Sequence, residues 1–214
     1  MTTNARTLTL TNLRHNFGVR LNPNDSFFAQ WLKQVPPLTE AEQQGLERLT
    51  RNYTYLSQED PPLEEVVKLV VVSPLLDLAD FYQPPFLIRT EVGTTLEVAD
   101  EPDISPIQGK IDILVVQETL WILAIESKPA RLDVTAGIPQ ALTYLLSAPT
   151  SQSVLYGMVT NGREVLFVRL YRSQPSPQYS RSLTYRLLEN AQEREQVLQG
   201  LKYLGTLLPT EALP

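Results

Sequence analysis

The sequence predicts a mixed α/β domain with a helical N-terminal section. Two apolar runs within residues 109–126 meet at a short polar turn, which is typical of a β-hairpin. Asn161-Gly162 separates two further apolar runs and is a strong signal for a second hairpin. Helical patterns precede these strands and follow them, so we expect helices packed on a sheet.

The composition sets the class of protein. The 214 residues, 43% hydrophobic and 20% charged, suffice for one sizeable core in a soluble globular protein. The net charge of −6 argues against a broad nucleic-acid-binding surface, although a local basic groove stays open. The absence of cysteine excludes disulfides and cysteine zinc sites, and one histidine, His15, excludes a histidine-rich metal centre. No signal peptide or membrane span is visible, so we expect a cytoplasmic protein.

The N-terminal section begins with an uncertain segment and continues with helices. The first twenty or so residues show no clear period, and residues 7–13 alternate weakly, so we expect a loose arm or an early strand there. Residues 26–34 predict a short helix. Residues 39–55 predict a longer one, because Thr39 is a suitable cap and two glutamates in the first turn suit the helix dipole.

The rest of the chain is punctuated by proline. Pro62 suits the start of a largely buried helix over residues 63–78, which Pro74 should bend or divide. The further expected elements are a strand at 86–92 with a partner at 96–99, a polar loop at 100–108, the hairpin at 109–126, a connection at 129–135, a helix at 136–146, strands at 153–160 and 164–171, a loop at 173–178, a strand at 181–187 and a helix at 188–207.

Charged residues stand in and beside the first hairpin. In a strand, residues two apart share a face, so Asp112 lies with Lys110 and Leu114, and Glu126 lies with Lys128. Antiparallel pairing around the turn would bring two carboxylates and one ammonium together at one end of the sheet. The alternative is a solvent-facing aspartate and an ordinary surface ion pair, which would contribute little stability.

Converging carboxylates and a lysine have a definite chemical use. Two carboxylates a few ångströms apart repel each other, and a hard divalent cation such as Mg²⁺ relieves that repulsion. Water bound to such an ion loses a proton more readily and can attack a phosphodiester. A nearby lysine can stabilise the developing charge. These residue types are the minimal parts of a metal-dependent nuclease.

The motif resembles that of the PD-(D/E)xK nuclease superfamily. Asp112 is followed by Glu126-Ser127-Lys128, and Gln140 and Tyr144 resemble the Q-x3-Y element of the RecB-like branch and of the N-terminal nuclease domains of type I restriction R subunits. Upstream, the stretches at residues 64–68, 72–76 and 88–91 resemble the first helix and first strand of those domains. The resemblance covers residues 63–171.

The resemblance implies a restriction-endonuclease-like core with a mixed central sheet flanked by helices. We expect residues 1–60 to form an arm and helices packed on that core, residues 61–187 to form the core, and residues 188–214 to form a C-terminal helix and tail. It also implies a metal site for Mg²⁺ or Mn²⁺ at Asp112 and Glu126. Glu64 is the third candidate metal ligand, because it fits the acidic position of the first helix better than Glu65 does.

The resemblance further implies the roles of the remaining site residues. Lys128 would be the catalytic lysine, and Gln140 would orient the site or touch DNA. Tyr144, Lys110 and Arg131 are the candidates for substrate binding. Lys110 and Arg131 are chosen as cations that could neutralise phosphates, independently of the resemblance. A tyrosine in the position of Tyr144 is more often a packing residue with a polar tip.

The expected function is restriction-type, Mg²⁺-dependent hydrolysis of phosphodiester bonds in DNA. Two alternatives stay open: a non-catalytic module of nuclease fold that binds a protein partner, and a metal-dependent phosphoesterase acting on a small nucleotide. Because the protein is acidic, a partner could supply DNA binding or translocation, and a homodimer is compatible with cutting both strands. No helicase motor follows the motif, so we do not expect a complete restriction subunit.

Overall fold

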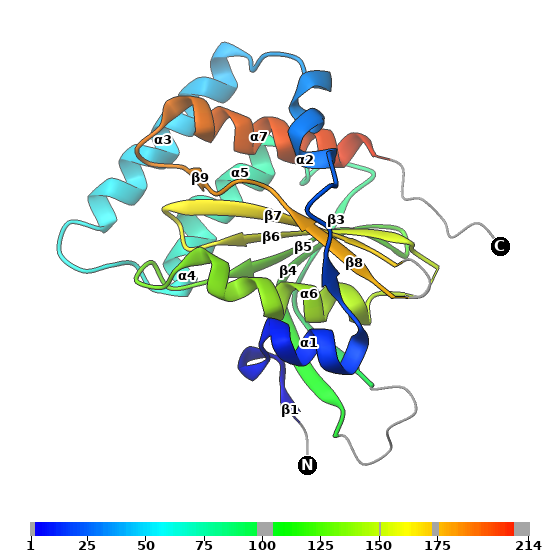
Figure 1. The fold of residues 1–214 in the computed structure, drawn as a ribbon. Coiled ribbons are helices and arrows are strands. Elements are labelled where there is room, and N and C mark those ends of the chain that lie inside the picture. Colours follow the sequence, from blue (N-terminus) through cyan, green and yellow to red (C-terminus); the bar gives the residue numbers. More distant parts are fainter. Residues whose placement is uncertain (1–2, 98–104, 150, 173–175, 208–214) are drawn as a thin grey trace.

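The computed structural model describes residues 3–97, 105–149, 151–172 and 176–207, and it confirms the predicted class. A mixed central sheet is flanked by helices on both faces (Figure 1). In the described residues the sheet has nine strands: β1 (Thr3–Asn4), β2 (Arg20–Leu21), β3 (Leu87–Leu96), β4 (Ile107–Gln117), β5 (Leu120–Ser127), β6 (Val154–Thr160), β7 (Glu164–Tyr171), β8 (Gln178–Arg181) and β9 (Tyr185–Arg186).

The strand order is β1-β4-β5-β6-β7-β8-β2, with β3 also paired to β4 and β9 to β7. β3, β4 and β5 are antiparallel, as the hairpin prediction requires. β5 and β6 are parallel, and helix α6 (Ile138–Ser147) lies between them in sequence and carries the chain from one strand to the other. The predicted hairpin of β6 and β7 is confirmed, with Gly162 in the left-handed region at φ 85°.

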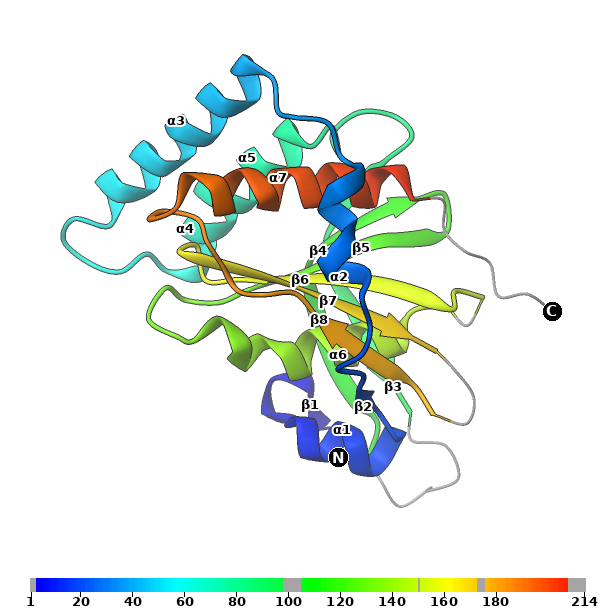
Figure 2. The same ribbon diagram turned by 45° about the horizontal axis from the view of Figure 1, so that its top comes forward.

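The helices form two layers. The upper layer in Figure 1 contains α2 (Phe27–Gln30), α3 (Glu40–Leu56), α5 (Ser73–Leu78) and α7 (Ala191–Thr206), and α4 (Glu64–Val67) leads into α5. The lower layer contains α1 (Leu10–Phe17) and α6, and the turned view keeps this separation (Figure 2). None of the helices in the described ranges has the length and apolar character that crossing a membrane requires.

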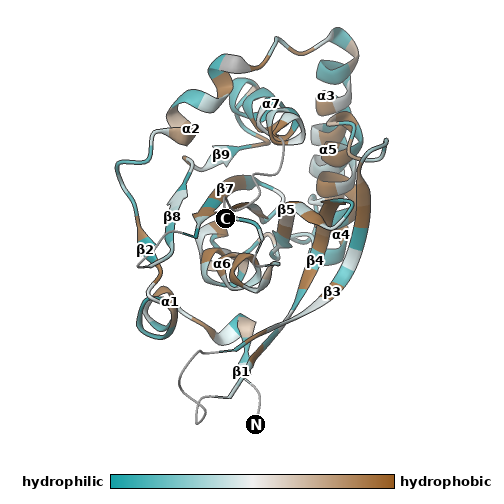
Figure 3. Cartoon of the chain, turned by 90° about the vertical axis from the view of Figure 1, so that its right-hand side faces the viewer, coloured by the Kyte–Doolittle hydropathy of each residue, from teal (hydrophilic) through white to brown (hydrophobic). Residues whose placement is uncertain are grey.

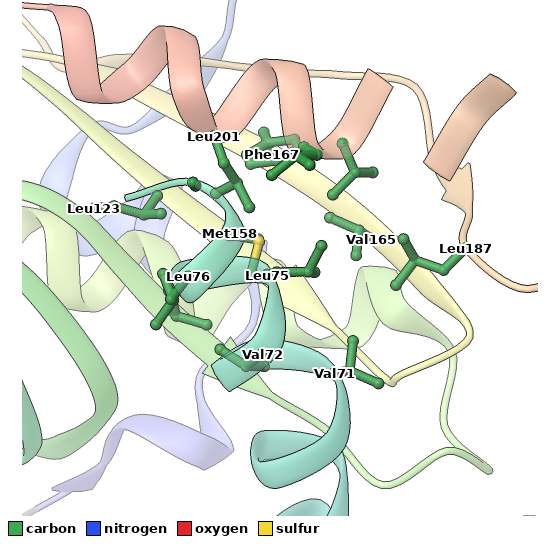
Figure 4. Close-up of a cluster of buried hydrophobic side chains, with 14 of the residues drawn as sticks. Val71, Val72, Leu75, Leu76, Leu123, Met158, Val165, Phe167, Leu187 and Leu201 are labelled. Carbon is green, nitrogen blue, oxygen red and sulfur yellow. The ribbon is translucent and has the colours of Figure 1, made fainter. Parts of the chain in front are cut away.

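Each layer buries its own hydrophobic cluster against the sheet. On the upper side, α5 and the turn before it pack on the strands and α7 (Figure 4). The residues labelled there are Val71, Val72, Leu75, Leu76, Leu123, Met158, Val165, Phe167, Leu187 and Leu201. On the lower side, Leu142 and Leu145 of α6 pack with Leu114 and Ala124. Hydrophobic residues accordingly run along β4 and α5 (Figure 3).

The predicted helix over residues 63–78 is present but changes its winding. A π-helical turn, Lys68–Val72, separates α4 from α5. The main-chain N–H of Ser73 donates to the carbonyl of Lys68, five residues earlier. Pro74 follows directly and has no N–H to donate to the carbonyl four residues earlier. A regular α-helix would lack a hydrogen bond at this point, and the wider π turn accommodates that loss.

The arm or strand prediction for residues 7–13 is wrong. This segment enters α1, because Thr9 and Asn12 form a reciprocal capping box at its N-terminus. Gly18 closes the helix with φ 67°, a conformation that costs glycine little. Short polar residues that weaken a strand pattern are here the signals for the start of a helix.

Two further strand predictions and one loop prediction need correction. The strand at 86–92 extends to Leu96, which pairs with Ile107, so Leu96 does not start a partner strand. The loop predicted at 100–108 gives up its last residues to β4, and residues 98–104 lie outside the described ranges. Of the strand predicted at 181–187, Arg181 is the last residue of β8, and only Tyr185 and Arg186 form β9. Between them, the Ser182 hydroxyl accepts the N–H of Phe167 in place of a backbone carbonyl. In the loop predicted at 173–178, residues 173–175 also lie outside.

Candidate active site

The pairing of β4 with β5 brings the two predicted acidic residues together. Ile113 pairs with Ile125, so Asp112 and Glu126 occupy the next position along the ladder. Both side chains are buried, with 4% and 1% of their surface exposed. The main-chain N–H of Ser127 donates to Oδ2 of Asp112 at 2.6 Å and fixes that carboxylate to the end of β5.

Burial and the charges of neighbouring carboxylates raise the pKa of both carboxyl groups. Burial raises the pKa of Asp112 to about 6, against the hydrogen bond from Ser127, which lowers it. Burial, followed by the charge of Asp112, raises the pKa of Glu126 to about 7, against the charge of Lys128. Oε2 of Glu126 is buried and has no hydrogen-bond partner in the described part of the chain. A buried carboxylate oxygen left without a partner is costly, and a cation would compensate it.

Lys128 is held beside this pair by a chain of hydrogen bonds. Its Nζ donates to Oε1 of Glu126 and to Oε1 of Gln140, each at 2.6 Å. Nε2 of Gln140 donates to the hydroxyl of Tyr144 at 2.5 Å, and that hydroxyl donates to the carbonyl of Lys110 at 2.7 Å. This series of hydrogen bonds links α6 to the strand that carries Asp112, and it holds the ammonium of Lys128 in place.

Local structure explains why these side chains meet. Gln140 and Tyr144 are one turn apart on the face of α6 that lies against the sheet, and both are buried. The N–H of Lys128 bonds to the carbonyl of Thr160 at 2.7 Å, which extends the parallel ladder past the end of β5. Gly137 precedes α6, and a Cβ there would lie 2.5 Å from Val159 Cγ1 and 3.2 Å from Lys128 Cε. A side chain at this position would therefore require Val159 to move and the lysine stem to shift slightly.

The structure separates Glu64 from Glu65. The charge of Glu64 contributes to the raised pKa of both Asp112 and Glu126, and its carboxylate lies 3.8 Å from Arg6. Glu65 is 77% exposed in its side chain and turns to Lys68. Of the two helix residues, Glu64 is therefore the one whose charge acts on the pair. It does not complete a three-residue ligand set, since no three acidic or histidine side chains in the described ranges lie close enough to share an ion.

The donor set suits a hard divalent cation that keeps most of its water. Asp112 and Glu126 supply adjacent carboxylates, and Oε2 of Glu126 has an unused acceptor. Mg²⁺ is commonly held by one or two carboxylates with several waters, so two ligands suffice. The residues present therefore fit Mg²⁺ or Mn²⁺.

Two charged residues that the sequence argument did not assign also reach the pair. Lys68 lies with its Nζ 4.0 Å from Oδ1 of Asp112 and 3.5 Å from Glu91. Glu91 is in β3, between residues that pair with Ile111 and Ile113, so it stands across the ladder from Asp112. The only sequence signal for Lys68 is its position after two glutamates on a helix that a proline must distort.

The predicted substrate-binding residues fall in three environments. Tyr144 is 1% exposed with its hydroxyl engaged, so it supports Gln140 from within the fold. Lys110 is 62% exposed in its side chain and pairs with Glu91 at 2.7 Å, at the edge of the site. Arg131 lies in the loop after Lys128 and lines a cavity of about 290 Å³ whose walls include Asn161, Arg163 and Glu164.

Comparison with known proteins gives little further information. No family model and no curated protein matches this chain. Among solved structures, it is similar to a fragment described as "a putative HsdR subunit of a type I restriction enzyme from Vibrio vulnificus YJ016". The identity is 20%, the TM-score is 0.39, and the match covers 66% of this chain and 26% of that one. Such a distant likeness carries no argument about function.

Proposed function

We propose that this protein is a Mg²⁺- or Mn²⁺-dependent DNA endonuclease of restriction type, built on a restriction-endonuclease-like core. The observation that supports the proposal is the meeting of Asp112, Glu126 and Lys128 at one end of the β4–β5 hairpin. Two buried carboxylates and a fixed ammonium are costly to bury without a purpose. Metal-assisted phosphodiester hydrolysis uses all three.

Each of the three residues has a separate role. Asp112 and Glu126 would hold the cation, which would polarise a phosphate oxygen and make a bound water more acidic. Lys128 would place its ammonium where negative charge develops on the phosphate, or would orient the attacking water. Its proximity to Glu126 keeps the ammonium inside the site before substrate arrives.

Gln140 and Tyr144 act as positioning residues. Gln140 accepts from Lys128 and donates to Tyr144, so a change at either position would displace the ammonium. Burial raises the pKa of the Tyr144 hydroxyl, which therefore stays protonated and remains a donor to the carbonyl of Lys110. We assign Tyr144 this supporting role in place of contact with substrate.

Substrate binding would rest on a small number of cations. Lys110 is exposed beside the carboxylates and can reach a phosphate, and Arg131 lies just past the catalytic lysine. A protein of net charge −6 has few cations with which to neutralise a DNA backbone. We therefore propose that a protein partner, or a second copy of the chain, helps to hold the DNA.

A cleavage assay tests the function. The purified protein is incubated with supercoiled plasmid, linear duplex and single-stranded DNA in Mg²⁺ or Mn²⁺, beside Asp112→Asn and Lys128→Met. Lys202→Met is the matched control, because Lys202 forms an ion pair with Glu42 between α7 and α3. We expect the wild type and the control to cut DNA, and both site variants to lose activity by at least about a hundredfold.

The same assay separates the alternatives. Loss of a phosphate from mononucleotides, without cutting of any DNA, would replace the nuclease with a phosphoesterase. A folded wild type that binds metal, yet acts on neither substrate, would leave the non-catalytic module. Equal cutting by Asp112→Asn and the wild type would place the chemistry elsewhere in the chain.

A further inference from the structure

Lys68 brings a second ammonium to the acidic pair, from a different element than Lys128. It is only 13% exposed in its side chain, and three carboxylates surround its Nζ. The nearest oxygens belong to Glu65 at 2.8 Å, Glu91 at 3.5 Å and Asp112 at 4.0 Å. These acids come from a helix and from two strands, so the arrangement depends on the tertiary fold.

The backbone is distorted on both sides of this contact. Lys68 is the first residue of the π-helical turn, a feature that is rare and frequently found at functional sites. Glu91 has φ 55° in the middle of β3, although it is not glycine. Non-glycine residues in this region cost energy and persist where the surrounding structure holds them in place. Both distortions occur in residues that carry the charges around Asp112.

The acidic pair itself has an unmet need for positive charge. Lys128 neutralises Oε1 of Glu126, while Oε2 of Glu126 is buried without a partner among the described residues. Lys68 stands at the long end of ion-pair distance from Asp112. Lys68 therefore neutralises the charge of Asp112 only in part. Its ammonium also forms ion pairs with Glu65 and Glu91, and it can keep these when it moves away from Asp112.

We propose that Lys68 is the resident counter-ion of the carboxylate pair and competes with the divalent cation for it. The inference rests on the proposed function, because the cation is the one that the nuclease would use. An ammonium and a divalent cation near the same carboxylate repel each other, so Lys68 lowers the affinity of the site for metal. When a metal ion binds, the Lys68 ammonium would move away from Asp112 and keep its ion pairs with Glu65 and Glu91.

The proposed role and a purely structural role predict opposite changes in metal affinity. Removing a positive charge beside a cation site increases the affinity for metal, whereas removing a side chain that holds the site in place decreases it. Lys68→Met removes the charge and keeps the aliphatic stem. Lys68→Gln removes the charge and keeps a polar group at the end of the side chain. Lys68→Arg keeps the charge, and Lys202→Met again removes a lysine from a distant ion pair.

Calorimetric titration of Mn²⁺ into the metal-free full-length proteins tests the proposal. We expect Lys68→Met and Lys68→Gln to bind Mn²⁺ about tenfold more tightly than the wild type, and Lys68→Arg and Lys202→Met to match the wild type. Circular dichroism and thermal unfolding establish that each variant is folded, and Lys68→Gln serves if Lys68→Met does not fold. Unchanged or weaker binding by the neutral variants, or no binding by any protein, would overturn the proposal.

The readout keeps this inference separate from the nuclease. If the neutral variants bind Mn²⁺ more tightly but the protein cuts no DNA, the proposed nuclease activity is contradicted and the role of Lys68 as counter-ion is supported. Cutting by the wild type, with equal Mn²⁺ affinity in all variants, would remove only the role of Lys68.

Discussion

The hydrogen bond from the N–H of Ser127 to Oδ2 of Asp112, 2.6 Å long, couples the two strands of the candidate site. It uses the main chain of the residue that follows Glu126, so the position of one carboxylate fixes that of the other. It also satisfies a buried donor at the point where β5 ends. Asp112 thus holds the hairpin end together and supplies half of the charge.

Two substitutions at Asp112 should separate these tasks. Asp112→Asn keeps an oxygen for Ser127 and removes the repulsion with Glu126, so we expect metal-free protein at pH 7.5 to be at least as stable as the wild type. Asp112→Ala leaves the Ser127 N–H buried without an acceptor, which costs about 1–3 kcal/mol. Urea unfolding should rank alanine below asparagine, and both variants should lose Mn²⁺ binding. Equal stability of the two variants would show that the hydrogen bond contributes nothing.

Stability without metal should fall as the pH rises through the range where the carboxyl pair ionises. The pKa values of Asp112 and Glu126 rise on folding, from 3.8 to about 6 and from 4.5 to about 7. The folded chain therefore binds more protons than the unfolded chain between about pH 4 and 7, and stability decreases across that range. At about 1.4 kcal/mol for each unit by which a pKa rises, the loss attributable to the pair is on the order of 6 kcal/mol by pH 8.

The measurement compares variants, because other carboxyl groups titrate as well. The pKa values of Asp25 and Glu42 fall on folding, which opposes the effect in the wild type. Glu126→Gln should become more stable relative to the wild type as the pH rises from 5 to 8. A difference that stays constant with pH would contradict the raised pKa of Glu126.

The sequence predicted the part of the site that depends on strand pairing. Alternation and the short turn suffice to place Asp112 near Glu126, because the register of a tight hairpin follows from its turn. The position of Gln140 and Tyr144 on one helical face was equally accessible. The position of Lys68 could not be predicted, since the direction of its side chain depends on a π turn that no periodic pattern encodes.

The fold shows the same division. Long periodic segments, such as α3 and the β6–β7 hairpin, matched their predictions. The short strands β1 and β2 have two residues each and depend on partners far away in the sequence, namely β4 and β8. Two residues cannot display a period, so only tertiary pairing defines them.

Tyr144→Phe should impair the site without changing its charges. Loss of the hydroxyl leaves Nε2 of Gln140 and the carbonyl of Lys110 without their partner, at a cost of about 1–2 kcal/mol. Gln140 can then rotate away from Lys128, so we expect kcat for DNA cleavage to fall while Mn²⁺ affinity is retained. Tyr55→Phe is the control, because Tyr55 is 71% exposed. Unchanged kcat in Tyr144→Phe would remove Tyr144 from the positioning chain.

Gly137→Ala should disturb the position of Lys128 through packing alone. The backbone at Gly137, with φ −83° and ψ −10°, is one that alanine adopts freely, so strain is not the cause. The new Cβ would lie 2.5 Å from Val159 Cγ1 and 3.2 Å from Lys128 Cε. Overpacking of this kind costs about 1–3 kcal/mol, and the stem of Lys128 must move. We expect lower stability in urea and reduced cleavage, with Mn²⁺ affinity retained.

Gly93→Ala is the matched control for this effect. A Cβ at Gly93 meets nothing within 4 Å, although Gly93 lies on β3, beside the same hairpin. Its stability should stay within about 0.5 kcal/mol of the wild type, with unchanged cleavage. If Gly137→Ala matched this control in both measurements, the stem of Lys128 would have room to spare, and its position would depend on Glu126 and Gln140 alone. Loss of stability in Gly137→Ala with full cleavage would instead separate the packing of Val159 from the placement of the lysine.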